Sequence, residues 1–117
     1  MAKSRKREHK RVSTAISVLL RSPDGRRETT EEICNISLGG VFIHMKDPFS
    51  FGTDIDLQFN LPQRSQVVKC KGFVVWSTKT SPERGDGRPG IGVRLMDIGV
   101  REMRLLNQFI EQEIKDS

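Results

Sequence analysis

Hydrophobic and polar residues alternate along most of the chain. The clearest run lies between Asp54 and Leu61, where Ile, Leu, Phe and Leu occupy every second position and Asp, Asp, Gln and Asn fill the others. Successive side chains of a β-strand point to opposite faces, so this pattern predicts a strand with one buried face. Five further segments have strand-like alternation or composition: 12–20, 28–36, 41–43, 66–78 and 91–96. We therefore expect six strands.

The C-terminal segment follows a different period. Apolar residues recur there three or four positions apart, which predicts an amphipathic helix over residues 99–115. Short turns such as Ser22-Pro23-Asp24-Gly25 separate the strand segments and favour antiparallel neighbours. The fold class expected is mainly β, a small six-stranded antiparallel β-barrel with a C-terminal α-helix.

The positive charge of the chain is concentrated at its start. The chain has 117 residues, which suits one domain, and a net charge of +5. Residues 1–11 hold six basic side chains and one acidic side chain, and residues 12–117 hold the other 14 basic and 14 acidic side chains. We therefore expect a basic flexible arm over 1–11 and a single domain over 12–117. Such an arm is a solvated tail, an electrostatic contact for nucleic acid or lipid, or half of an anion site.

Several classes of function find no support in the sequence. No apolar stretch is long enough to span a bilayer or to act as a signal core, so a cytoplasmic location is expected. Cys34 and Cys70 lack metal-site spacing and are expected to be buried, reduced thiols, and no metal site is predicted. No metalloprotease, phosphate-loop or dinucleotide motif occurs, and we expect no catalytic residues and no enzyme activity. Trp76 is expected in the core or against the helix.

Two short motifs suggest a nucleotide site. Arg7 and Arg11 form an RxxxR pattern, and an Arg can grip the O6 and N7 edge of guanine or pair with phosphate. Downstream, Asn35 and Ser37 lie two positions apart, so on a strand their amide and hydroxyl leave the same face. The residues that follow, Gly39–Gly40, permit a tight turn and close approach of a ligand.

RxxxR followed by NxSxxG resembles the signature of the PilZ domain, a bacterial module. The segments 72–76 and 90–95 and the terminal helix also fit that family, so the resemblance covers nearly the whole chain. It implies a six-stranded barrel that binds cyclic di-GMP and needs no other cofactor. The ligand-binding residues it implies are Arg7, Arg11, Asn35, Ser37, Gly39 and Gly40, with Lys6 and His9 as candidate secondary contacts.

The resemblance also implies a mechanism and leaves alternatives. A stand-alone receptor would bind the dinucleotide between the arm and the barrel and relay the signal to an unidentified effector protein. Family members take one ligand or a stacked pair, and Lys6, which lacks the planar fork of Arg, favours one. The first alternative is a basic-arm module for nucleic acid or a membrane surface, although no specific nucleic acid is expected. The second is an adaptor that docks a protein through Phe73, Val75 and the helix without ligand.

Overall fold

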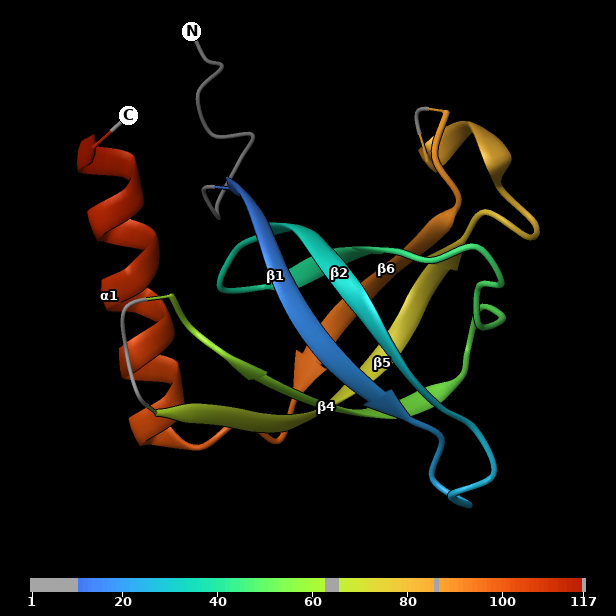
Figure 1. The fold of residues 1–117 in the computed structure, drawn as a ribbon, viewed down its shortest axis with the longest axis horizontal. Helices are drawn as coiled ribbons and strands as arrows, with labels where there is room; N and C mark the ends of the chain where they lie inside the picture. The colour runs from blue at the N-terminus through green and yellow to red at the C-terminus, as the bar shows by residue number, and fades with distance from the viewer. Residues whose placement is uncertain (1–10, 63–65, 86, 117) are drawn as a thin grey trace, which may run out of the picture.

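The computed structural model describes residues 11–62, 66–85 and 87–116. This part of the chain contains six strands, a short 3-10 helix and one α-helix (Figure 1). The strands are β1 (Val12–Arg21), β2 (Glu28–Ile36), β3 (Gly40–His44), β4 (Asp54–Asn60), β5 (Val67–Ser77) and β6 (Gly90–Met96). The 3-10 helix η2 covers Pro82–Gly85 in the β5–β6 connection, and α1 covers Val100–Asp116.

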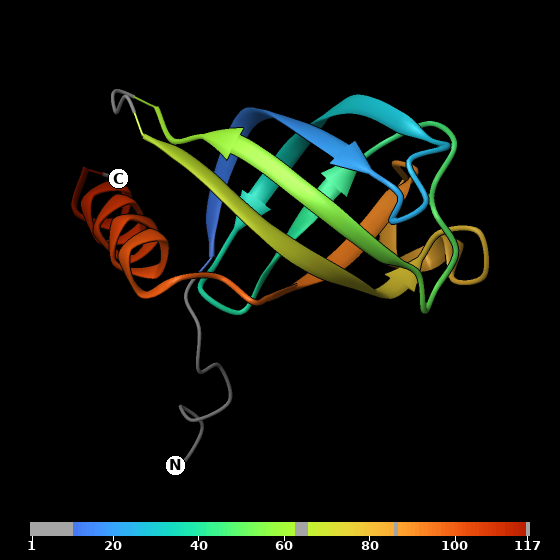
Figure 2. The same cartoon turned by 90° about the horizontal axis from the view of Figure 1, so that it is seen from below.

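The six strands form a closed barrel in the order β1-β2-β3-β6-β5-β4 (Figures 1 and 2). Every neighbouring pair is antiparallel. The predicted fold class is therefore confirmed, and each predicted strand overlaps an observed one. The order places β6 between β3 and β5, so the last strand joins two hairpins that are distant in sequence.

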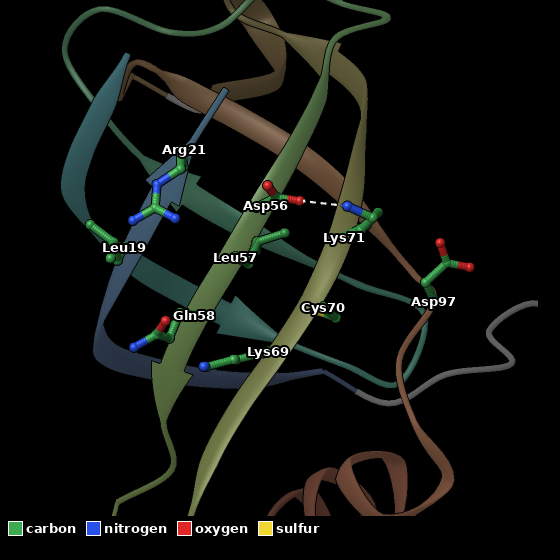
Figure 3. A pocket seen from close by; sticks show the side chains of 9 residues that line it. All are labelled: Leu19, Arg21, Asp56, Leu57, Gln58, Lys69, Cys70, Lys71 and Asp97. Carbon is green, nitrogen blue, oxygen red and sulfur yellow. Dashed lines mark hydrogen bonds and ion pairs between the residues drawn. The ribbon is translucent and has the colours of Figure 1, made fainter. Parts of the chain in front are cut away.

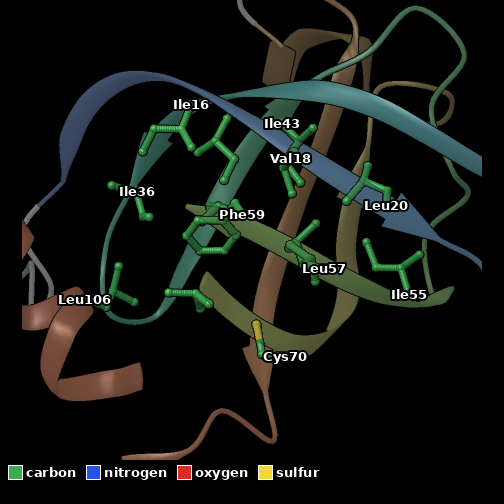
Figure 4. Close-up of a cluster of buried hydrophobic side chains, with 14 of the residues drawn as sticks. Ile16, Val18, Leu20, Ile36, Ile43, Ile55, Leu57, Phe59, Cys70 and Leu106 are labelled. Atoms are coloured by element: carbon green, nitrogen blue, oxygen red, sulfur yellow. The ribbon is translucent and has the colours of Figure 1, made fainter. Parts of the chain in front are cut away.

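The core lies inside the barrel and is made by the inward face of every strand (Figure 4). The alternating segment that gave the clearest sequence signal is β4, whose Ile55, Leu57 and Phe59 are each at most 2 % exposed. At one end of the barrel, α1 adds Leu106, Phe109 and Ile110 to the same core. The apolar face predicted for the helix therefore packs on the barrel.

A bulge in β5 changes which side chains face outward. The pairing of β5 with β6 shifts register between Val74 and Trp76, so Val75 is an extra residue. Val74 and Ser77 are fully buried, whereas Trp76 is only half-buried and is absent from the core. The expectation that Trp76 lies in the core was wrong, because the bulge reverses the alternation of the strand at that point.

Cys34 and Cys70 are free thiols, and both are buried. Burial raises the pKa of the Cys70 thiol to about 11, and the negative charge of Glu102 adds to this rise. Among the described residues, no helix combines the length and the apolar character needed to cross a membrane.

Candidate functional site

The turn between β2 and β3 is held together by the Ser37 side chain. Ser37 Oγ accepts hydrogen bonds from the backbone N–H groups of Gly39 and Gly40, each at 3.2 Å, and lies 3.2 Å from the Gly40 carbonyl. The Ser37 N–H also donates to that carbonyl at 2.9 Å. Ser37 is 8 % exposed. Its hydroxyl therefore braces the turn, and direct contact of this hydroxyl with a ligand stays a prediction.

Gly40 allows two strands to approach closely. A Cβ atom at this position would lie 2.3 Å from the carbonyl oxygen of Val93 on β6. The glycines with positive φ in the described chain are Gly25, Gly52 and Gly87. The requirement for glycine at position 40 is therefore steric, at the β3–β6 contact, and does not come from an unusual backbone angle.

Asn35 presents its amide on the outer face of the barrel. On β2 it pairs with Ser13 of β1 on one side and Phe42 of β3 on the other. The side chain is half-buried and makes no hydrogen bond to any other part of the described structure. Two donors and one acceptor are thus left for a ligand.

Arg11 enters the same region. It directly precedes β1, whose first residue, Val12, pairs with Ile36 of β2. Continued by one position, this register brings exposed Arg11 opposite Ser37. The structure therefore places one predicted arginine beside the NxSxxG turn. Arg7, Lys6 and His9 lie outside the described residues.

An aromatic surface extends from Asn35 across the barrel. Phe42 of β3 stacks on Trp76 of β5 with ring centroids 5.4 Å apart and an angle of 18° between the planes. The two rings meet over Gly92 of β6, where a Cβ atom would lie 2.1 Å from the indole nitrogen. The Arg84 guanidinium, from η2, lies 5.8 Å from the Trp76 ring centroid. This surface was not predicted from the sequence, because it depends on the bulge at Val75.

Arg94 is a second feature that was not predicted from the sequence. It pairs with Gly40 of β3 and with Phe73 of β5, and its exposed side chain has no ion pair within the described residues. The signal was available in the sequence. Gly90, Gly92 and Arg94 recur at period two, so they share the outward face of a strand whose Ile91 and Val93 are buried.

The site combines positive charge, a free amide and flat aromatic surface. Arg11, Arg84 and Arg94 approach it from three elements, and the row Ser13, Asn35, Phe42, Gly92 and Trp76 carries no carboxylate. An anionic ligand with planar bases suits this chemistry. Among the described residues, no three His, Cys, Asp or Glu side chains gather to hold a metal ion.

Comparison with known families agrees with this geometry. The family model described as the PilZ domain matches residues 5–112. The chain belongs to the PilZ domain family. The match includes both RxxxR arginines and the NxSxxG turn.

Solved structures of PilZ proteins share the fold at low sequence identity. The PilZ domain of YcgR from Escherichia coli with c-di-GMP has a TM-score of 0.69 and 14 % identity, over 95 % of this chain and 93 % of that one. The inhibitor of motility MotI/DgrA from Bacillus subtilis has a TM-score of 0.72 and 19 % identity, over 94 % of this chain. The match spans 52 % of MotI/DgrA, about half its length.

A third PilZ structure is more distant. The PilZ domain of CeSA from a cellulose-synthesizing bacterium has a TM-score of 0.54 and 18 % identity, over 91 % of this chain and 96 % of that one. No curated protein matches the chain. At these identities the solved structures establish the fold alone.

Proposed function

We propose that this PilZ protein is a cytoplasmic, non-enzymatic receptor for cyclic di-GMP that relays ligand binding to an effector protein. The observation that carries the proposal is the outward Asn35 amide, without a partner among the described residues, on a turn braced by Ser37 and beside Arg11. Family membership supports the choice of dinucleotide.

Each part of the site has a role in this proposal. Arg7 and Arg11 bind guanine edges and phosphates, since a guanidinium suits both. Asn35 hydrogen-bonds a guanine, and Ser37 and Gly40 hold the turn in place. A second base has the Phe42–Trp76 surface to stack on, because every base has a flat face that pairs with an aromatic ring.

The proposed signal is a change in the arm. The barrel fixes Asn35, whereas Arg7 and Arg11 come from the segment that precedes β1, so the ligand would bridge the two. Bridging gives the bound state contacts that the free state lacks, which a switch requires. Amide hydrogen exchange over residues 5–12 should therefore slow when cyclic di-GMP saturates the protein. Unchanged exchange would contradict the switch, but not the binding.

Calorimetric titration with cyclic di-GMP, cyclic di-AMP and GTP tests the proposal. We expect binding of cyclic di-GMP alone, and a loss of roughly 10- to 100-fold for Arg11→Ala and for Asn35→Ala, because each removes charge-assisted or paired hydrogen bonds. Asn107→Ala is the matched control, since it removes an exposed side-chain amide from α1, outside the site. Binding should also change the fluorescence of Trp76, the single Trp.

The same titration separates the receptor from a basic-arm module. Such a module would lose affinity equally for Lys3→Ala, Arg5→Ala and Arg7→Ala, with a steep dependence on salt. A specific site should single out Arg7 among these three. No heat and no change in Trp76 fluorescence at millimolar cyclic di-GMP would end the proposal.

A further inference from the structure

The outer face of β1, β4 and β5 is hollowed. One depression of about 390 Å³ lies over Arg21, Gln58, Lys69 and Lys71 (Figure 3). A second, of about 410 Å³, lies over Ala15, Ser17 and Asn60. Leu19 and Gln58 line both, so the two depressions adjoin, and together they are called the groove. Phe42 and Arg94 of the dinucleotide site line neither.

One wall of this groove is a strand edge that has no neighbour. β1 pairs with β2 from Val12 onward, but with β4 only over Val18–Arg21. Within the described part of the chain, no strand pairs with the β4 side of residues 12–17. Figure 1 shows β1 and β4 adjacent near the end of β1 and diverging toward its start. Unpaired N–H and C=O groups at such an edge can form a ladder with an added strand.

The side chains at this edge leave room for a partner. Ser13, Ala15 and Ser17 are exposed, small and uncharged. Lys, Pro and inward charges, which often protect exposed edges, are absent between positions 12 and 17, and the β-bulge between Ser13 and Ile16 lies on the side that pairs with β2. Leu19, half-buried in the middle of the groove, offers an apolar contact.

The charge at one end of the groove favours an acidic group of the occupant. Arg21 pairs with Glu28 at 3.0 Å, and Lys71 pairs with Asp56 at 3.0 Å. The hydrogen bond from Lys71 to Asp56 raises the pKa of Lys71, and the Asp97 charge adds to this. Lys69, which lies opposite Gln58, has no ion-pair partner among the described residues. Asp97 also lines the groove without an ion-pair partner among the described residues, but it lies beyond Lys71, whereas Lys69 lies beside Gln58 (Figure 3). An acidic group is therefore attracted at the Lys69 end of the groove.

We propose that this groove binds an extended segment of the effector protein, with uncharged residues along the free edge of β1 and a carboxylate at Lys69. The inference rests on the proposed function for its biological meaning, because it places the effector of that receptor. Its link to the dinucleotide site is β1 itself, which begins directly after Arg11 and forms the free edge at Ala15 and Ser17.

A peptide titration of the full chain, without dinucleotide, tests the groove. The probe is the capped heptapeptide Thr-Glu-Val-Thr-Val-Glu-Thr, added to millimolar concentration while backbone amide NMR shifts are recorded. We expect shifts confined to residues 13–19, 58–60 and 69–71. A copy with Lys in place of both Glu residues should bind at least roughly fivefold more weakly, since like charges then meet at Lys69. A copy with N-methylated alternate amides should not bind, because it cannot form the ladder.

Two variants complete the test. Lys69→Glu should weaken the acidic peptide and strengthen the Lys peptide, whereas Lys46→Glu, an exposed change outside the groove, should alter neither. No shifts at the groove, equal binding of the N-methylated peptide, or self-association of the protein through the β1 edge would overturn the inference. If cyclic di-GMP does not bind, the expected results of the peptide titration stay the same. Each of the two proposals can therefore be contradicted without the other.

Discussion

At the scale of single residues, the shape of the site depends on side chains that are small or, at the glycines, absent. Gly92 leaves space for the Trp76 indole, and Gly40 leaves space for the Val93 carbonyl. The Ser37 hydroxyl forms hydrogen bonds within the turn that carries the motif. These residues shape the surface on which Asn35 and the arginines act.

Gly92→Ala should destabilise the protein by about 1–3 kcal/mol, because the added Cβ overlaps the indole and forces repacking. Urea unfolding followed by far-UV circular dichroism measures the change. In a Trp76→Ala background the same substitution should cost far less, since the overlapping ring is gone. An equal loss of unfolding free energy in both backgrounds would show that the added Cβ does not clash with Trp76.

The Cys70 thiol should make stability fall at alkaline pH. Its pKa is about 11 in the folded state and about 8.5 in an unfolded chain, so only the unfolded state releases the proton between these values. This contribution is constant below pH about 8 and is lost as pH rises toward 11. The difference in unfolding free energy between the wild type and Cys70→Ala should therefore narrow over that range. A constant difference would mean that the thiol ionises equally in both states.

At the scale of elements, α1 closes one end of the barrel. Leu106 is fully buried, and Phe109 and Ile110 are each 4 % exposed, so the helix contributes to the same core as the strands. Its outward residues, including Asn107, are exposed.

Leu106→Ala should cost about 2–5 kcal/mol of unfolding free energy, because it leaves a cavity at the junction of helix and barrel. Asn107→Ala, one position away and exposed, should change stability by less than about 0.5 kcal/mol. Thermal or urea unfolding of both variants makes the comparison. Equal effects would mean that the helix does not pack as described.

At the scale of the whole molecule, the barrel and helix form one core without disulfides. A single core of this size should unfold in one cooperative transition. Urea curves from Trp76 fluorescence, which reports on the outer surface, and from far-UV circular dichroism should therefore coincide. Separate midpoints would show that part of the barrel opens independently of the rest.

The fold was predictable because burial of one face of each element leaves a regular pattern of hydrophobic and polar residues in the sequence. The inward rows of β4 and the apolar face of α1 are visible as periods of two and of three to four. Asn35 and Arg11 were predicted as ligand contacts from their motifs and from the resemblance to the PilZ signature. In the structure Asn35 pairs with Ser13 of β1, two positions after Arg11.

The rest of the site depends on contacts between distant segments. Trp76 reaches the surface because of one extra residue in β5, which the pattern of β5 alone does not reveal. The groove beside Leu19 extends from the paired part of β1 and β4 to the point where the two strands separate, and β4 lies more than 30 positions further along the chain. Local patterns carry no information about such a divergence.

The place of β6 between β3 and β5 also decides when the protein can fold during synthesis. The barrel cannot close until residues 90–96 have left the ribosome, because β6 pairs with both β3 and β5. Before that point the five earlier strands can form only an open sheet, in which β3 and β5 are unpaired edge strands. Nascent chains halted before that point should be sensitive to protease and dependent on chaperones, and those halted well beyond it should not.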